Sequence, residues 1–492
     1  MCARSTPSWR SGRGSPKRGL LNCAMAAEKF DVVVVGAGIG GLIVACQLAQ
    51  AGKRVVVLEQ LGFAGGRFTA IRQKGTELAT GAFHTFPHGN RGPMADALRR
   101  CGAEVIVPTP IHFGSFHVRG EEVVARTFWQ AFGVFASRTE CVRLVWTVLK
   151  AKFIKQSELS FGHWLVQQGL SETGVALFDR FAQFALSASV FDVPYAEGRK
   201  VIRRVVDHGL PGIPMGGARE VSRQLVLACV RQGVAIRRWS AVESLRFGDG
   251  DDISDGNSDV VGTSGGAAGQ VAGVRVLNRR TGERYAIDAP IVVSNAGTRV
   301  TRCLVDCPQR LGQTGGDAMP EPEPEPGPEQ QRQSAPNTPA AVGLKITVLS
   351  PQSLIDHDSI LFCLDTQRVA GIIQATNVDP SLAPPGQHLL ISHQTVPPGA
   401  DWRAEYALGL QDWRHVFGDR FDGCTVLGCA NFNRDWPVNW AVQGLDERTQ
   451  ALAQKGIWMV GDGFKPAGYM MVEGVAKNAQ EVVAAILGSP AG

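Results

Sequence analysis

VVVVGAGIGGLIVACQLAQAGKRVVVLE, residues 32–59, decides the fold. Its four leading valines predict a buried parallel strand, and Gly36, Gly38 and Gly41 follow at the GxGxxG spacing, which lets a helix N-terminus approach a pyrophosphate. A second apolar strand ends at Glu59, 18 residues after Gly41, where a carboxylate takes the hydroxyls of an adenosine ribose. The stretch therefore predicts an α/β fold with a dinucleotide site.

The surroundings of this loop favour nucleotide binding over a purely structural turn. A helical stretch covers residues 41–52, Gly40 extends the glycine run, and the turn Gly65-Gly66-Arg67 follows the second strand. A negative charge at Glu59 disfavours the 2′-phosphate of NADPH. We expect the loop to bind a dinucleotide that lacks this phosphate.

The composition is that of a globular protein. With 492 residues, 44% of them apolar, the chain can form two or three domains. No run reaches the roughly 18 apolar residues of a membrane-spanning helix. Residues 1–24 carry five basic and no acidic side chains, so the formal net charge of +5 falls to zero outside them. The remainder is not basic, and we expect no nucleic-acid partner.

The leader, residues 1–24, allows two interpretations. Its richness in Arg and Ser and its lack of acids are typical of an organelle transit peptide. Met25 is an equally good start, because the first expected strand follows it within a few residues. We expect the leader to be disordered, and the protein to be cytoplasmic or organellar, in the plastid if the leader is a transit peptide.

The eleven cysteines contain no CxxC pair. The two closest pairs, Cys303 with Cys307 and Cys424 with Cys429, have three and four intervening residues and no partner pair, which does not suit a zinc or iron-sulfur site. We expect scattered buried thiols in a reducing compartment, and no metal.

Two segments interrupt the globular pattern. Residues 248–270 are acidic and glycine-rich, and residues 313–340 include PEPEPEPGPEQQ, compositions that resist folding. We expect both to be disordered surface insertions. Between and around them, residues 121–190 show a helical pattern, residues 455–461 a parallel strand, and residues 474–487 a final helix. A tryptophan-rich stretch (Trp402, Trp413, Trp436 and Trp440) either forms core or lines an apolar cavity.

One expected helix is amphipathic and basic. Val142, Val145, Trp146, Leu149 and Phe153 fall on one side of it, with lysines and arginines around the remainder. Such a helix can lie in a membrane interface. A helix packed on the core with snorkelling lysines explains the pattern too, and soluble proteins make such helices often. Peripheral membrane contact is therefore one of two open expectations.

The motifs together resemble the superfamily of flavoprotein amine oxidases and phytoene desaturases. The resemblance rests on residues 32–60, on Gly65-Gly66-Arg67-Phe68-Thr69, on IVVSNA at 291–296, and on Gly461-Asp462 through MVEGV at 471–475. It implies FAD as cofactor and a two-domain FAD-binding fold of the glutathione-reductase type. The implied domains are a discontinuous FAD-binding domain (25–110, 211–300 and 455–492) and an interleaved α+β substrate domain (111–210 and 341–454).

The resemblance also implies which residues hold FAD. The turn Gly65-Gly66-Arg67 packs against flavin and pyrophosphate in that family, and the strand end at Gly461 and Asp462 reaches the ribityl chain and the phosphates. The helix that begins near Met471 and Val472 points its N-terminus at the isoalloxazine, where the helix dipole stabilises negative charge on the reduced ring.

Within the superfamily the closer likeness is to carotenoid desaturases and isomerases. PGIPMGGARE at 211–220 resembles their Pro-x-x-Gly-Gly turn, and SNAGT at 294–298 resembles their SNAD turn. One departure is Ala79, which stands where those enzymes usually carry an aspartate, and His84 and His88 follow it. The specific substrate therefore stays open.

Three residues are candidates for catalysis. Lys345 lies in an otherwise apolar strand, and in the amine oxidases that the chain resembles a lysine in a similar strand holds a water near flavin N5. His84 and His88 are candidates for a weak base that accepts a proton. Each has a structural alternative: hydrogen bonding near the FAD turn for the histidines, and a solvated strand edge for the lysine.

These features favour an FAD-dependent oxidoreductase that acts on a long apolar isoprenoid, by desaturation or isomerisation of a carotenoid-type substrate with hydride transfer to flavin N5. A flavin amine oxidase or porphyrinogen oxidase of the same fold is the first alternative, although the chain has only four tyrosines to flank a flavin. A non-catalytic prenyl-binding escort protein is the second, and the intact Glu59 and Asp462 motifs speak against it.

Overall fold

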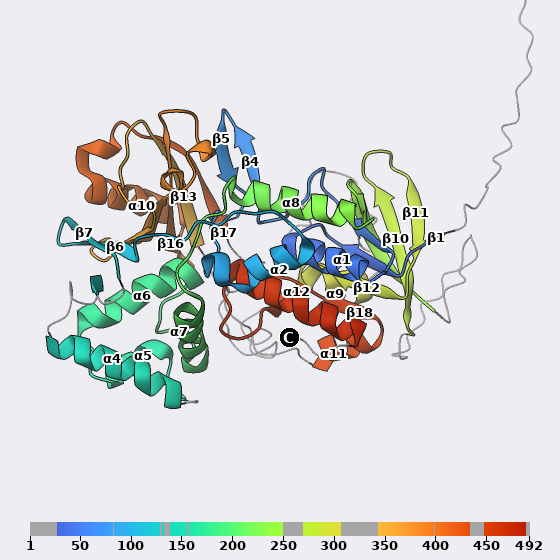
Figure 1. Ribbon diagram of the computed structural model, residues 1–492, viewed down its shortest axis with the longest axis horizontal. Helices are drawn as coiled ribbons and strands as arrows, with labels where there is room; N and C mark the ends of the chain where they lie inside the picture. The colour runs from blue at the N-terminus through green and yellow to red at the C-terminus, as the bar shows by residue number, and fades with distance from the viewer. Residues whose placement is uncertain are drawn as a thin grey trace, which may run out of the picture.

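The computed structural model describes residues 27–81, 83–127, 130–131, 138–154, 157–248, 269–306, 343–397, 399–432 and 447–488. It is a mixed α/β protein built on two large sheets at opposite ends of the molecule (Figure 1), which confirms the expected fold class. The leader and nearly all of the two expected insertions lie outside the described residues. No helix among the described residues is long and apolar enough to cross a membrane.

A five-stranded parallel sheet carries the glycine motif. Its order is β18 (Ile457–Met459), β12 (Ile291–Ser294), β2 (Val32–Val35), β3 (Val55–Leu58) and β8 (Ala235–Arg237). All four valines of β2 are buried, because a parallel sheet is covered on both faces. The strand expected within residues 455–461 is therefore present, one strand away from β2.

Helices cover one face of this sheet and a smaller sheet covers the other. The helices are α1 (Ile39–Gln50), α2 (Pro93–Cys101), α8 (Gly217–Arg231) and α12 (Met471–Leu487). On the other face lie β1 (Glu28–Lys29), β9 (Ser240–Phe247), β10 (Val271–Asn278) and β11 (Arg284–Asp288), with α9 (Thr298–Asp306) and α11 (Glu447–Gln454) nearby. The two ends of the chain thus share one core.

A seven-stranded sheet forms the opposite end of the molecule (Figure 1). Its order is β17 (Thr425–Phe432), β13 (Gly343–Ser350), β16 (His388–Thr395), β15 (Val369–Gln374), β14 (Ile360–Cys363), β6 (Gly114–Val118) and β7 (Glu121–Ala125). β12 and β13, which flank the second expected insertion, belong to different sheets. A hairpin of β4 (Ala70–Gln73) and β5 (Thr76–Ala79) stands apart.

Helices pack on this sheet and beside it. α10 (Trp402–Phe417) covers one face, and α6 (Glu172–Leu186) contacts the other. α4 (Arg138–Phe153), α5 (Phe161–Gln167) and α7 (Tyr195–His208) form a helical group with α6. The 3-10 turns are η1 (Gly89–Arg91), η2 (Ala375–Asn377), η3 (Pro380–Leu382), η4 (Gly418–Phe421) and η5 (Asp462–Phe464).

Two expectations are refined by these elements. The helical pattern expected from residue 121 is wrong at its start, because Glu121–Ala125 pairs with β6 as an edge strand. Trp413 is fully buried in the core, and its indole N–H donates to Ser392 Oγ at 3.0 Å. Trp436 and Trp440 lie outside the described residues. All strands of the five-stranded sheet lie within the segments expected for the FAD-binding domain, and all strands of the seven-stranded sheet lie within those expected for the substrate domain. The exact domain boundaries remain a prediction.

Candidate functional site

The glycine loop leaves the first turn of α1 open to a ligand. Gly36 has a positive φ of 95°, and a Cβ on Gly41 would lie 2.4 Å from the Gly36 carbonyl oxygen, so this tight turn requires both glycines. Gly38 caps α1 without any side-chain hydrogen bond to the helix N-terminus. Uncapped amides at a helix N-terminus are an anion site, which suits a pyrophosphate.

Glu59 lies at the end of β3, directly beside that loop. The carboxylate is buried and accepts hydrogen bonds from the N–H groups of Ala37 and Leu61, each at 2.8 Å. An ionised carboxylate has about four acceptor positions. The two that remain suit the ribose hydroxyls of a dinucleotide.

Asn295 connects the loop to the C-terminal part of the chain, and the sequence did not single it out as a site residue. In the amide orientation that satisfies both ends, its oxygen accepts from the Gly38 N–H at 3.2 Å and its nitrogen donates to the Val460 oxygen at 3.3 Å. A Cβ on Gly38 would collide with this side chain. Asn295 belongs to the SNAGT turn, so the resemblance contained the signal for it.

Two cations share one carboxylate beside the second glycine turn. Arg67 forms an ion pair with Asp462, and Lys465 Nζ lies 3.0 Å from Asp462 Oδ1. Burial, and then the charge of Arg67, lower the pKa of Lys465 to about 7. The Gly65 N–H donates to the Ala37 oxygen at 2.7 Å, which joins this turn to the first loop. The excess of positive charge beside an uncapped helix fits the pyrophosphate of FAD.

The N-terminus of α12 completes this side of the site. Met471 adopts a positive φ of 46°, and the side chain of the N-cap residue Met470 makes no capping hydrogen bond to the helix. Val472 is buried. α12 therefore begins at Met471, as the resemblance implies for this helix, and the contact of Met471 and Val472 with FAD stays a prediction.

Glu473, in the first turn of α12, is a buried carboxylate that the sequence did not single out. It accepts hydrogen bonds from the N–H groups of His88 at 3.1 Å and Met94 at 2.7 Å. Burial raises its pKa to about 7. A Cβ on Gly92 would lie 2.5 Å from this carboxylate. Glu473 thus fixes the start of α2 to the start of α12.

His84 and His88 lie in different environments. His84 Nδ1 accepts from the Ala218 N–H at 3.0 Å, so Nε2 donates to the Glu77 oxygen at 3.0 Å. This arrangement leaves no free lone pair on the ring and favours its structural role. His88 is buried, and neither of its ring nitrogens has a hydrogen-bond partner among the described residues. Burial lowers the pKa of His84 to about 4 and that of His88 to about 3.

Lys345 points from β13 of the large sheet towards the loop after the Arg67 turn. Its Nζ donates to the carbonyl oxygens of Ala79 at 2.7 Å and Gly81 at 2.6 Å, and burial lowers its pKa to about 8. A Cβ on Gly81 would lie 2.3 Å from the Arg67 oxygen. Lys345 is therefore linked to Arg67 through one short segment. An ammonium has three N–H donors, so one donor remains for a water or a substrate.

His393 is the cross-strand partner of Lys345, and sequence reasoning missed it. Its Nε2 lies 2.8 Å from Ser187 Oγ, whereas its buried Nδ1 has no partner in the part of the chain that the structure describes. Burial, and then the charge of Lys345, lower its pKa to about 4. The rings of Phe83 and Phe184 lie 5.8 and 6.4 Å from its ring. His393 thus lies in an aromatic neighbourhood.

Comparisons with known proteins agree with this architecture. A family model for NAD(P)-binding Rossmann-like domains matches residues 34–101. An uncharacterised protein of Methanocaldococcus jannaschii is 29% identical over 92% of this chain and 98% of its own length. The crystal structure of an oxidoreductase from Methanosarcina mazei superposes with a TM-score of 0.73 at 27% identity, over 92% of this chain and 99% of its own.

More distant similarities extend to enzymes with named activities. An all-trans-retinol 13,14-reductase of Danio rerio is 26% identical over 57% of this chain and 49% of its own length. A prolycopene isomerase of an Oncidium hybrid cultivar is 37% identical over 18% of this chain and 16% of its own. A putrescine oxidase shares the fold, with a TM-score of 0.62 at 15% identity over 94% of this chain and 99% of its own.

The sequence motifs, the fold and the comparisons all indicate an FAD-binding protein. The uncapped N-terminus of α1, the carboxylate of Glu59 and the pair of Arg67 and Asp462 fit FAD as the cofactor. In sequence motifs and fold the chain is similar to the FAD-dependent oxidoreductases, a superfamily that includes the flavin amine oxidases and the phytoene desaturases.

Proposed function

We propose that this oxidoreductase acts on a long apolar isoprenoid or polyene, by desaturation or isomerisation of a carotenoid-type substrate. The observation that carries the proposal is the cross-strand pair of Lys345 and His393. His393 lies beside two phenylalanine rings, and Lys345 bonds to the segment that follows Arg67. The similarity to a retinol reductase and a prolycopene isomerase supports the same substrate class.

The chemistry divides between cofactor and protein. FAD, when bound, supplies the hydride acceptor at N5. The protein positions the substrate and excludes water, and a polyene requires only a weak acid or base. Lys345 has a remaining N–H donor, and His393 Nδ1 is buried without a partner. Either group can hold a proton or a water beside the reacting carbon.

A cleft of about 240 Å³ lies between the loop at residues 108–111, the turn at 211–213 and the seven-stranded sheet. Its apolar lining consists of Pro108, Pro110, Ile111, Pro211, Ile213, Ile360, Ile373 and Val378. One wall is the segment that resembles the Pro-x-x-Gly-Gly turn of carotenoid enzymes. The lining suits part of an apolar chain.

The surroundings of Tyr469 weaken the alternative proposal that the protein oxidises amines. An amine oxidase needs aromatic walls that face the substrate amine, and Tyr469 is the tyrosine nearest to the C-terminal FAD motif. The guanidinium of Arg204 lies 4.4 Å above the ring of Tyr469. A cation on that face repels a protonated amine.

Anaerobic mixing of the purified flavoprotein with candidate substrates tests the proposal. We expect absorbance at roughly 450 nm, which oxidised flavin shows, to bleach with an isoprenoid polyene and to persist with primary or secondary amines. Where the net reaction is an isomerisation, chromatography of the polyene detects it. Bleaching by amines alone would overturn the proposal, and colourless protein that cannot be reconstituted with FAD would support the escort alternative.

We expect Lys345→Met to keep its flavin and to lower the rate of flavin reduction by about two orders of magnitude, a typical contribution of general acid–base catalysis. Methionine preserves most of the buried volume and removes the N–H donors. Stopped-flow flavin reduction measures the rate, and the absorbance ratio of flavin to protein verifies cofactor content. An unchanged rate in a fully flavinylated variant would contradict a role for Lys345 in the reaction.

We further propose peripheral membrane contact through α4. Val142, Trp146 and Phe153 are 68%, 59% and 81% exposed, so the apolar side of this helix is not packed on the core. Lys155 lies outside the described residues. An apolar substrate would reach the enzyme from lipid, and exposed aromatics on a basic helix suit an anionic interface.

The double variant Trp146→Glu with Phe153→Glu tests this contact. We expect it to lose at least about tenfold in binding to anionic lipid vesicles, because burial of aromatic area drives such binding, with flavin content unchanged. Val230→Glu, at a position 57% exposed on α8, is the matched control. Equal vesicle sedimentation of all three proteins would exclude α4 as the membrane contact.

A further inference from the structure

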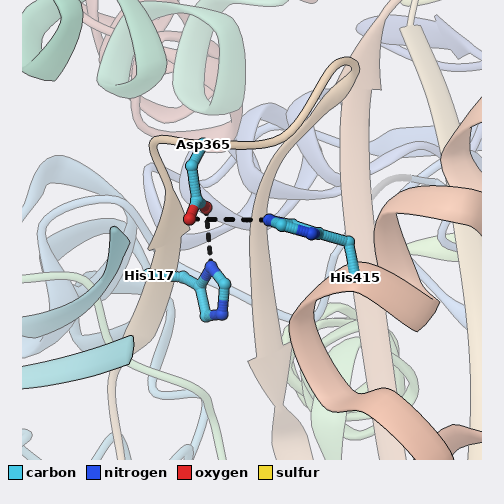
Figure 2. Close-up of side chains that lie close together, drawn as sticks. All are labelled: His117, Asp365 and His415. Atoms are coloured by element: carbon cyan, nitrogen blue, oxygen red, sulfur yellow. Dashed lines mark hydrogen bonds and ion pairs between the residues drawn. The ribbon is translucent and has the colours of Figure 1, made fainter. Parts of the chain in front are cut away.

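His117, Asp365 and His415 converge near the β6–β7 edge of the seven-stranded sheet (Figure 2). His117 lies on β6, Asp365 follows β14, and His415 lies in the last turn of α10. Figure 2 shows the Asp365 carboxylate between the two imidazoles. Its oxygens lie 2.6 Å from His117 Nδ1 and 3.5 Å from His415 Nε2.

We propose that His117, Asp365 and His415 form a binding site for a divalent transition-metal ion, with Zn²⁺ as the expected occupant. Two imidazole nitrogens and one carboxylate are a common zinc ligand set, and three protein ligands leave a fourth position for water or another small ligand. Imidazole ligands favour zinc and its transition-metal neighbours over Mg²⁺ or Ca²⁺, which prefer oxygen ligands.

The distances suit a metal after small adjustments of the ligands, because the 2.6 Å contact between His117 Nδ1 and Asp365 Oδ1 must lengthen and His415 must approach. One ligand atom from each residue lies within 4.8 Å of the others, and tetrahedral zinc with bonds of about 2.0 Å needs separations of about 3.3 Å. His117 is buried, and the Gly120 N–H holds Asp365 at 2.9 Å. The side chain of His415 is 47% exposed, so its rotamer can close the remaining gap.

A further carboxylate lies on the strand beside His117, and it pairs with a different histidine. Glu122 is the cross-strand partner of His117 on β7 and forms an ion pair with His357 at 3.1 Å. His112 with Asp358 is a further histidine–carboxylate pair at this edge. Among the described residues, only the His117 group adds a second histidine within reach of the same ion.

The three ligands lie at positions 117, 365 and 415, so a search for closely spaced metal ligands in the sequence does not find them. An ion held by all three would join β6, the loop after β14 and α10 at a sheet edge. The alternative is a hydrogen-bonded cluster without affinity for metal, in which Asp365 simply pairs with two histidines. The two cases differ in stoichiometry and in the atoms that bind an added ion.

Titration of the metal-free flavoprotein with Zn²⁺ by calorimetry tests the proposal. We expect one saturable site per chain, with affinity reduced at least tenfold in His415→Ala and in Asp365→Asn. His163→Ala removes an exposed histidine elsewhere and should bind as the parent does. Because His415 is half-exposed, its loss should leave folding and flavin content intact. Absent saturable binding, or equal binding in His415→Ala, would overturn the proposal.

X-ray absorption at the zinc edge identifies the ligand atoms independently. We expect a first shell of nitrogen and oxygen only at about 2.0–2.1 Å. A shell that contains sulfur at about 2.3 Å would mean that cysteines bind the ion, and would likewise overturn the assignment to His117, Asp365 and His415.

Discussion

Replacement of Gly65 by alanine is expected to yield a folded protein that does not retain flavin. Gly65 has a φ of 106°, and an added Cβ would lie 2.7 Å from the Cβ atoms of both Ser222 and Thr69. A residue in this backbone region costs about 1–3 kcal/mol, and overpacking adds about 1–3 kcal/mol. The turn relieves both by moving away from Ala37, whose oxygen accepts the Gly65 N–H.

The loss of flavin is expected because the turn at Gly65 lies beside the FAD site. Gly65 precedes Arg67, whose partner Asp462 lies at the opposite end of the chain, so a displaced turn separates the two halves of the FAD site. A cost of only about 2 kcal/mol in the bound state weakens FAD binding about 30-fold. We expect a much lower absorbance ratio of flavin to protein after purification, and a correspondingly weaker FAD titration of the apoprotein.

Gly52→Ala is the matched control. Gly52 also has a positive φ, 84°, but nothing lies within 4 Å of an added Cβ, so the substitution adds backbone strain without crowding. It should lose some stability and keep its flavin. Full flavin retention by Gly65→Ala, or equal flavin loss in both variants, would show that the turn does not position the cofactor as described.

Local parts of this site could be predicted from the sequence because their signals are local. A run of valines, a glycine spacing and a carboxylate at a fixed distance specify β2, the loop and Glu59 within 28 residues. The resemblance then added Arg67 and Asp462, which meet in an ion pair. The spacing of residues within a short motif does not predict which distant residues tertiary packing brings into contact.

The partners of Asn295 and Glu473 could not be predicted from local sequence, although the SNAGT motif already contained Asn295. Asn295 bridges Gly38 and Val460, and Glu473 binds the Met94 N–H from 379 residues away. A polar residue in a helical pattern is usually exposed, and nothing local marks Glu473 as buried. The prediction of a helical pattern from residue 121 was wrong for a related reason. Residues from Glu121 form a strand because they pair with β6, and the local sequence does not show this pairing.

Histidine roles were similarly beyond the sequence. His84 was a candidate base, yet its two ring nitrogens bond to the backbone of Ala218 and Glu77, groups that only the fold brings near. His393 carries an unpartnered buried nitrogen beside Lys345 and had no motif around it. The chemistry of an imidazole depends on burial and partners, which are properties of the tertiary structure.

Glu473 should make stability depend on pH in a direction opposite to that of the buried histidines. Burial raises the pKa of Glu473 from its ordinary value of 4.5 to about 7. An acid with a raised pKa in the folded state stabilises fully below pH 4.5 and loses that contribution as pH rises through 7. His84 and His393 have pKa values lowered to about 4, so their contribution is present above pH 6.5 and lost as pH falls towards 4.

Comparison with Glu473→Gln isolates the glutamate, because the histidine contributions cancel between the two proteins. Glutamine keeps one acceptor for the N–H groups of His88 and Met94 and cannot ionise. We expect the unfolding free energy of the parent, relative to the variant, to fall by about 3 kcal/mol between pH 4.5 and pH 8, since each pKa unit corresponds to about 1.4 kcal/mol. Denaturant unfolding at saturating FAD measures it. Glu172→Gln, at an exposed helix N-terminus, is the control, and its unfolding free energy should depend on pH as that of the parent does. The same pH dependence in Glu473→Gln as in the parent would mean that the Glu473 carboxylate is not held in a buried, uncompensated position.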